Sequence, residues 1–266
     1  MDQETLTVTI VQMSSSAEID ENLESVVAEF EKAKLANSEL IIFPECALLW
    51  AKPDLTKARA LSEEAWLAKV ANLSRDYGIA AVWGGLALRD GEKVFNSALF
   101  IADSGELLSR YDKKHLFQVF AGSITVDETL SYCHGEGALS KVTLKGWTLG
   151  LSICYDLRFP ELYRQLGDCD AMICTAAFTK KTGRAHWELL LRARAVENQT
   201  YLLGAGQCGM NNITKVSAFG HSMVVDPWGK VVDQLDGNLG SFTVDLDKKY
   251  LMKCRDFLPA LRNKRL

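Results

Sequence analysis

The sequence predicts an α/β fold in which mixed β-sheets lie inside and helices lie outside. Short apolar segments typical of buried strands recur along the whole chain, and amphipathic helical segments are interspersed among them. Two sheets packed face to face would account for so many short apolar strands. No linker, low-complexity tract or long charge run divides the chain, so we predict a single domain over residues 1–266.

The first half of the chain alternates strand patterns with helix patterns. Leu6, Val8 and Ile10 alternate with threonines, and this period of two predicts a strand. Apolar residues then recur at helical spacing from Ile19 to Phe30, which predicts an amphipathic helix. Further patterns predict strands at 39–43, 79–88, 94–102 and 107–115, and a helix that Ser62 caps and Gly78 ends.

The second half repeats this rhythm and adds antiparallel patterns near its end. Residues 142–154 predict a hairpin that turns at Lys145 and Gly146. The remaining patterns predict helices at 160–166 and 184–198, and strands at 171–174, 201–205, 219–225, 230–235 and 241–244. No element is predicted for residues 124–132. The basic end at 253–266 is interpreted as a solvated tail or a subunit contact.

Composition and charge narrow the classes of function. Lys and Arg total 30 and Asp and Glu total 34, so the formal net charge is −4. A mildly acidic chain is a poor binder of polyanions, and we predict no nucleic-acid partner. No run approaches 18 apolar residues, so we predict no membrane span. The seven cysteines form no C-x-x-C pair and the N-terminal segment lacks a signal-peptide pattern, so we expect a cytoplasmic protein.

Cys154 is the first candidate for chemistry. The most apolar strand pattern stops at this residue, polar residues follow, and Pro160 then begins a helix. The thiol is thereby placed at the carboxyl edge of a sheet, where open α/β folds bind their ligands, and the backbone N–H of Tyr155 would face the same ligand. The alternative for a single cysteine is a small buried apolar residue. A Cys–His dyad also stays open, with any of three histidines: His115, His186 or His221.

Two further segments place charged groups at or near strand ends. Glu45 follows the apolar segment ELIIFP, and a carboxyl group in apolar surroundings has a raised pKa and exchanges protons near neutrality. In the segment RYDKKHLF, Lys113 shares a strand face with His115, because adjacent strand residues face opposite ways. Glu128 lies in the region without a predicted element. The alternative for Glu45, Lys113 and Glu128 is an exposed surface residue.

Metal and nucleotide sites have little support in the sequence. The four histidines show neither H-E-x-x-H nor another paired spacing, so we predict no metal. Glycines at 84–85 and at 204–206 follow strands but match neither G-x-G-x-x-G nor a Walker pattern. These glycines therefore do not predict a nucleotide-binding protein.

Three motifs carry a family resemblance. In chain order, FPECALLW, YDKKHLF and SICYDLRFPEL closely resemble the Glu–Lys–Cys motifs of the nitrilase superfamily of carbon–nitrogen hydrolases. The resemblance extends over nearly the whole chain and includes GRAHWELLLRARAVENQTYLLGAGQCG and FGHSMVVDPWGKVV. It implies a four-layer α-β-β-α sandwich, a homodimer or larger homo-oligomer, and hydrolysis of a non-peptide C–N bond without a cofactor.

The resemblance also implies a role for each candidate residue. Cys154 would be the nucleophile, Glu45 the general base, and Lys113 the cation that lowers the thiol pKa and stabilises the oxyanion. Glu128 matches a second acidic residue that the family often has upstream of the cysteine motif. The small-Pro-Gly turn that often follows in relatives is replaced here by SYCHGEG. The residues predicted to bind substrate are Tyr155, Arg158 and Phe178.

A small linear amide, cleaved to acid and ammonia through a thioester, is the substrate class that the resemblance implies. The segments QCG and GHSMVVDPWG are most similar to the branch that hydrolyses deaminated glutathione. An ω-amidase acting on 2-oxoglutaramate-like acids is the closest alternative, followed by a nitrilase, an N-carbamoylase and a catalytically silent binding protein. The first two substrates carry carboxylates, so a basic pocket residue is expected. The candidates are Arg158, Lys180, Lys181 and Arg184.

Overall fold

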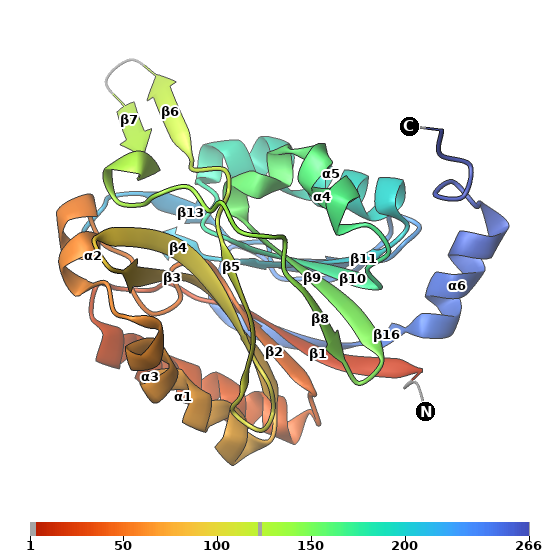
Figure 1. The fold of residues 1–266 in the computed structure, drawn as a ribbon, viewed down its shortest axis with the longest axis horizontal. Helices are drawn as coiled ribbons and strands as arrows, with labels where there is room; N and C mark the ends of the chain where they lie inside the picture. Colours follow the sequence, from red (N-terminus) through yellow and green to blue (C-terminus); the bar gives the residue numbers. More distant parts are fainter. Residues whose placement is uncertain (1–3, 122–123, 266) are drawn as a thin grey trace.

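Two β-sheets packed face to face, with helices over both outer faces, form the computed structural model (Figure 1). The structure describes residues 4–121 and 124–265. Within these residues each large sheet has six strands and mixes parallel with antiparallel neighbours. The layers run helix, sheet, sheet, helix, which confirms the predicted four-layer α-β-β-α sandwich.

The first sheet has the strand order β16-β1-β2-β3-β4-β5. Its strands span Thr5–Gln12 (β1), Leu40–Phe43 (β2), Ala80–Asp90 (β3), Lys93–Ile101 (β4), Leu107–Asp112 (β5) and Gly240–Asp247 (β16). The neighbours β1, β2 and β3 are parallel, and the other pairs are antiparallel. Leu6, Val8 and Ile10 belong to the apolar core between the sheets, as their alternation predicts.

The second sheet has the strand order β15-β14-β11-β10-β9-β8, with a parallel centre formed by β9, β10 and β11. Its strands span Lys141–Leu144 (β8), Trp147–Ile153 (β9), Ala171–Ala176 (β10), Tyr201–Gly206 (β11), Met223–Val225 (β14) and Val231–Gln234 (β15). Two short ribbons pair Gln118–Ala121 (β6) with Ile124–Asp127 (β7), and Cys208–Met210 (β12) with Ser217–Phe219 (β13).

Helices cover both outer faces of the sandwich (Figure 1). They span Ile19–Leu35 (α1), Pro53–Arg59 (α2), Glu63–Tyr77 (α3), Pro160–Leu166 (α4), Lys180–Asn198 (α5) and Lys248–Phe257 (α6), with 3-10 turns at Glu128–Leu130 (η1) and Cys154–Arg158 (η2). Phe30 of α1 and Trp66 of α3 are buried against the first sheet, and Trp187 of α5 is buried against the second. No helix among the described residues is long and apolar enough to cross a membrane.

The ends of α3 follow the sequence prediction. The Ser62 hydroxyl accepts a hydrogen bond from the Ala65 N–H and caps the helix. Gly78 ends it in the left-handed conformation with a φ of 66°. A polar cap at one end and a glycine at the other are local signals, so both ends of the helix could be predicted from the sequence alone.

Two predicted strands are wrong in their extent. The strand predicted at 107–115 ends at Asp112, so Lys113 follows the strand instead of lying in it. The strand predicted at 219–225 is broken between β13 and β14. Gly220 and His221 have positive φ angles there, which interrupt a pleated strand.

Other elements occur where no helix or strand is predicted. Residues 124–132 contain β7 and η1, and α2 fills a stretch without apolar periodicity. α6 begins at Lys248 and reaches into the basic end, where Leu251 and Cys254 are buried. Part of that end is therefore a packed helix and not a solvated tail.

Candidate active site

Four side chains predicted from the sequence meet near strand ends of the two sheets. Glu45 follows the carboxyl end of β2, Cys154 follows that of β9, and Lys113 follows that of β5. Glu128 begins the turn η1 directly after β7. Lys113 contacts both carboxylates, and Cys154 lines the same cavity as these carboxylates. The structure therefore brings the four residues into one site.

The Glu45 carboxylate accepts hydrogen bonds from three donors. Its Oε1 atom accepts from Lys113 Nζ at 2.8 Å and from Asn96 Nδ2 at 2.9 Å, and its Oε2 atom accepts from the Ala177 backbone N–H at 2.8 Å. The residue is only 2% exposed, and a buried carboxylate needs such partners because burial removes its hydration. Both oxygens are thereby fixed in position.

Lys113 is buried between two acidic residues. Its Nζ atom lies 2.8 Å from Glu45 Oε1 and 2.9 and 2.8 Å from the two oxygens of Glu128. Burial disfavours the ammonium, but the charges of Glu128 and Glu45 outweigh burial and raise the pKa of Lys113 well above its usual value. Burial also raises the pKa of Glu128, and Lys113 opposes that shift. The site therefore holds a permanent positive charge.

Cys154 stands at a sharp turn between β9 and η2. Its φ is 49°, a left-handed conformation that is uncommon for a residue with a side chain. Burial, followed by the charge of Glu45, raises the thiol pKa well above its usual value, although Lys113 acts in the opposite direction. Lys113 therefore lowers the thiol pKa as expected, but burial and Glu45 outweigh its effect. The thiol carries its proton at neutral pH.

A bulge in β3 lies beside Glu45. The pairing of β3 with β4 shifts register between Trp83 and Leu86. Gly85, inside the bulge, has a φ of 62°, and a Cβ atom there would lie 2.4 Å from the Cys46 backbone nitrogen and 2.6 Å from Glu45 Cγ. Only glycine allows this approach. The glycine that resembled no nucleotide motif thus makes room for the Glu45 segment.

A cavity of about 260 Å³ lies over Glu45, Glu128 and Cys154. This volume suits a small molecule. Lys52, directly before α2, is the one lysine or arginine among the described residues that line this cavity. It escapes prediction because its segment has no apolar periodicity and no motif. The larger apolar side chains of the lining are Leu49, Trp50, Phe117, Val126, Leu130 and Val216.

The residues predicted to bind substrate lie beside this cavity. Tyr155, Arg158 and Phe178 line a niche of about 20 Å³ that shares Cys154 and Phe117 with the larger cavity. The niche has room for about one water molecule. The Arg158 guanidinium lies 5.4 Å from the ring centre of Phe178 and 5.8 Å from that of Tyr155.

The basic candidates for a substrate carboxylate separate into two groups. Arg158 lines the niche. Lys180, Lys181 and Arg184 lie in the first turns of α5, and none of them is among the described residues that line either cavity. The structure therefore does not bring these three α5 residues to the site.

The histidines take other partners. His115 Nδ1 lies 2.7 Å from Asp156 Oδ1, and His186 Nδ1 lies 3.2 Å from Arg158. Neither these two nor His221 is among the described residues that line the cavities. Over residues 4–121 and 124–265, no group of three or more His, Cys, Asp or Glu is placed to hold a metal ion. The structure gives no support to a Cys–His dyad.

Two partners of Glu45 were missed at the level of the sequence. Asn96 is an amide in the largely apolar β4, and this mismatch is the signal that could have identified it. Ala177 contributes only its backbone N–H. A backbone donor leaves no trace in the pattern of side chains, so only the tertiary structure reveals it.

The fold and the site define the class of protein. The chain matches the carbon–nitrogen hydrolase family over residues 7–256, and it belongs to this family. This match confirms the resemblance of the three motifs. The solved structure of the Caenorhabditis elegans NitFhit protein has a TM-score of 0.91 at 33% identity, over 100% of this chain and 66% of that chain.

Curated relatives narrow the comparison further. The deaminated glutathione amidase of Dictyostelium discoideum is 43% identical over 180 residues, which are 66% of this chain and 61% of that protein. The deaminated glutathione amidase of Homo sapiens is 34% identical over 269 residues, which are 97% of this chain and 82% of that protein. The chain spans 57% to 61% of the length of the first three curated relatives that it matches.

Proposed function

We propose that this chain is an amidase that cleaves a small linear amide to acid and ammonia through a thioester on Cys154. The observation that carries the proposal is one buried ammonium, Lys113, held between Glu45 and Glu128 beside a thiol at the same cavity. Membership of the carbon–nitrogen hydrolase family supports the bond type. The names of the two relatives support an amide as the substrate.

The first step is attack of Cys154 Sγ on the amide carbon. Burial raises the thiol pKa, so the thiol proton has to leave as the S–C bond forms. Glu45 is the acceptor in this proposal, since its carboxylate lies at the cavity together with the thiol. The Ala177 N–H holds Glu45 Oε2, and Ala177 lines the same cavity as Cys154.

The attack leaves a negative oxygen on the tetrahedral intermediate. In the proposal this oxygen is stabilised by the Lys113 ammonium and by the backbone N–H of Tyr155. Lys113 suits the task because its pKa is raised, so its charge does not depend on pH in the ordinary range. Loss of one donor to such an oxygen typically costs about 10²–10³ in rate.

Glu45 returns and accepts protons in the remaining steps. The C–N bond breaks as Glu45 protonates the leaving nitrogen, and ammonia departs. A water molecule then gives a proton to Glu45 and attacks the thioester carbon. The C–S bond breaks, the acid is released, and the sulfur regains its proton from Glu45. Glu128 keeps Lys113 charged and oriented throughout.

Deaminated glutathione is the proposed substrate, with ω-amides of 2-oxoglutaramate type as the second candidate. The human relative that covers 97% of this chain is named for the first activity. Both substrates are anionic. Lys52 lines the larger cavity and Arg158 lines the niche, and Cys154 lines both, so each cation is a candidate partner for a substrate carboxylate. A nitrilase comes third, since the Caenorhabditis elegans relative that matches 97% of this chain at 34% identity is named a nitrilase fusion protein. An N-carbamoylase and a silent binding protein have no observation in their favour.

Ammonia release across a panel of compounds tests the proposal. The panel contains deaminated glutathione, ω-amides, carbamoyl compounds and nitriles. We expect the highest kcat/KM for deaminated glutathione, and a mass increase of one acyl group on the Cys154 peptide after rapid quenching. No ammonia from any amide, with a Cys154 no more reactive to alkylation than Cys169 or Cys254, would make the chain a binding protein instead.

We further propose a cytoplasmic homodimer or larger homo-oligomer, with one domain over residues 1–266. Leu189 and Val196 are exposed on α5, and Phe257 at the end of α6 is 79% exposed and lies with its ring centre 5.6 Å from that of Trp228. A second copy covering this face would remove apolar surface from water. Light scattering should give at least twice the mass of one chain, and Leu189→Asp should lower it. A monomeric wild type would contradict the assembly.

A further inference from the structure

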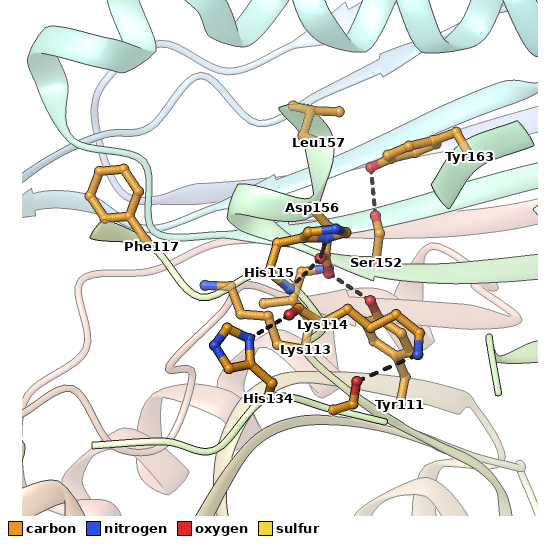
Figure 2. A network of polar contacts seen from close by, with 12 residues as sticks. Tyr111, Lys113, Lys114, His115, Phe117, His134, Ser152, Asp156, Leu157 and Tyr163 are labelled. Atoms are coloured by element: carbon orange, nitrogen blue, oxygen red, sulfur yellow. Dashed lines mark hydrogen bonds and ion pairs between the residues drawn. The ribbon is translucent and has the colours of Figure 1, made fainter. Parts of the chain in front are cut away.

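Asp156 is a fully buried carboxylate two residues after Cys154, and it accepts four hydrogen bonds (Figure 2). Its Oδ2 atom accepts from the Ile153 N–H at 3.0 Å and from the Tyr111 hydroxyl at 2.8 Å. Its Oδ1 atom accepts from the His115 N–H at 3.1 Å and lies 2.7 Å from His115 Nδ1. Asp156 uses both oxygens and has no part in the mechanism proposed above.

Asp156 contacts two parts of the site, and its Oδ2 atom alone reaches both, since Tyr111 lies two residues before Lys113. The Ile153 N–H belongs to the residue directly before Cys154, so the Oδ2 contact closes the turn that presents the thiol. Both Oδ1 contacts come from His115, two residues after Lys113. One side chain thereby ties the turn of the nucleophile to the segment of the lysine.

The lysine segment is held by several contacts on other sides, among them the Gly135 N–H on the Lys113 carbonyl at 2.9 Å and His134 Nδ1 at 2.8 Å from the Lys114 carbonyl. The Lys113 N–H donates to the Asn96 carbonyl at 2.9 Å, which anchors the segment to β4. The Phe117 N–H donates to Glu128 Oε2 at 2.6 Å. His115 lies between these anchors, and Asp156 holds it. The backbone N–H groups of residues 113, 115 and 117 thus each donate a hydrogen bond. Of these three bonds, the one from His115 reaches the Cys154 turn.

The His115 ring is oriented by a second contact. It stacks on Phe159 with a centroid distance of 3.6 Å and an interplanar angle of 8°. The ring therefore presents its Nδ1 edge to Asp156 (Figure 2). Its face lies against Phe159, which directly follows η2. Burial and the charge of Asp156 raise the pKa of Tyr111, so its hydroxyl keeps its proton and remains a donor.

We propose that Asp156 and His115 are positioning residues that set the distance between the Lys113 ammonium and the Cys154 thiol. The proposal rests on the function proposed above, because it assigns these residues to the same site. Displacements of about 1 Å in catalytic geometry can cost on the order of 10²-fold in rate. The contact between Asp156 and His115 joins the Cys154 turn to the lysine segment, and it prevents such a displacement without touching the substrate.

The test uses three variants of the whole chain. His115→Ala removes the side-chain contact to Asp156. His115→Asn restores it, because the amide Nδ2 of asparagine occupies the place of the imidazole Nδ1. Ser152→Ala is the matched control: Ser152 lies two residues before Cys154, and its hydroxyl bonds Tyr163 at 2.6 Å and the Ile173 carbonyl at 2.9 Å, away from the lysine segment (Figure 2).

For His115→Ala we expect kcat to fall roughly 10- to 100-fold, with KM changed by less than about threefold. His115→Asn should recover most of kcat. Ser152→Ala should lower the melting temperature and leave kcat near that of the wild type. Three results would each overturn the proposal. The first is an unchanged kcat in His115→Ala, and the second is an equal loss of kcat in the alanine and asparagine variants of His115. The third is a kcat of Ser152→Ala that falls together with its melting temperature.

A second measurement separates this proposal from the proposed function. Iodoacetamide alkylation of the Cys154 peptide, followed by mass spectrometry, needs no substrate. Lys113 lowers the thiol pKa, so its displacement in His115→Ala should slow alkylation at pH 8, and His115→Asn should restore the rate. If the wild type turned over no amide but alkylated faster than His115→Ala, the proposed amidase function would be wrong and the positioning role would stand. Equal alkylation rates in all three chains would refute the positioning role alone.

Discussion

At the scale of single residues, the site contains one ammonium and two carboxylates around one thiol. Glu128 and Glu45 keep Lys113 charged, and the same two carboxylates raise the thiol pKa of Cys154 beyond the effect of burial. The two carboxylates therefore stabilise the lysine ammonium and destabilise a thiolate on Cys154. In the resting site Lys113 is charged and Cys154 is protonated. We therefore expect the thiol proton to leave during the catalytic step, with Glu45 as its acceptor.

Cys154→Ala should abolish ammonia release, because no other group at the cavity is proposed to form the thioester. The substitution removes one small buried side chain, so the fold should remain, with an unchanged circular dichroism spectrum. Cys169→Ala is the matched control, since Cys169 is also buried and its thiol donates to the Leu166 carbonyl, away from both cavities. Turnover by the Cys154 variant near the wild-type rate would end the proposed mechanism.

Glu128→Gln should have opposite effects on turnover and on thiol reactivity. Loss of the carboxylate charge removes one cause of the raised pKa of Cys154, so alkylation of Cys154 at pH 7 should become faster. Turnover should fall, roughly 10-fold or more, because Lys113 loses two of its three contacts to carboxylate oxygens. Alkylation and ammonia assays on the same preparation measure both. Slower alkylation in the variant would contradict the proposed electrostatics, and Glu24→Gln on α1 is the control.

At the scale of elements, a segment was predictable where its signals are local. The helix α3 has a polar cap, a periodic apolar face and a glycine stop, and all three are visible in the sequence. The helix α2 has seven residues and buries only Thr56, so it has no periodicity to read. The end of β5 was missed because no glycine or proline follows Asp112 to mark where the strand pairing stops.

The same distinction applies to the site. The positions of Glu45 and Cys154 at strand ends follow from apolar runs that stop, and this is local information. Asn96, the Ala177 N–H and Asp156 depend on contacts between elements far apart in the chain. Sequence patterns could therefore predict the reactive groups, whereas the groups that hold them in place required the packing of both sheets.

Gly85→Ala tests whether the β3 bulge positions Glu45. A Cβ at this position would meet the Cys46 nitrogen and Glu45 Cγ, so the Glu45 segment has to move and kcat should fall by about 10-fold or more. Gly91→Ala is the matched control, because Gly91 has a similar φ of 58° but no neighbouring atom within 4 Å. Both variants should lose about 1 kcal/mol of stability from backbone strain. Equal activity in both would show that the bulge has no influence on the site.

At the scale of the whole molecule, the core between the layers contains several protonated thiols. Burial raises the pKa of Cys174 to about 12 and the pKa values of Cys169 and Cys208 to about 11. In an unfolded chain a cysteine thiol has a pKa of about 8.5. The folded state therefore retains protons that the unfolded state has already lost at alkaline pH, and this difference links stability to pH.

The free energy of unfolding should decrease as the pH rises from about 8.5 towards 11. The unfolded chain binds fewer protons in this interval, so rising pH favours it, by about 1.4 kcal/mol per pH unit for each buried thiol whose folded pKa has not been reached. Urea unfolding in the presence of a reductant, at several pH values, measures the slope. Cys174→Ala removes the fully buried thiol with the higher pKa, so its slope should be shallower than that of the wild type by the contribution of one group. Other titrating groups act equally on both chains, and identical slopes would mean that Cys174 ionises as readily in the folded core as in the unfolded chain.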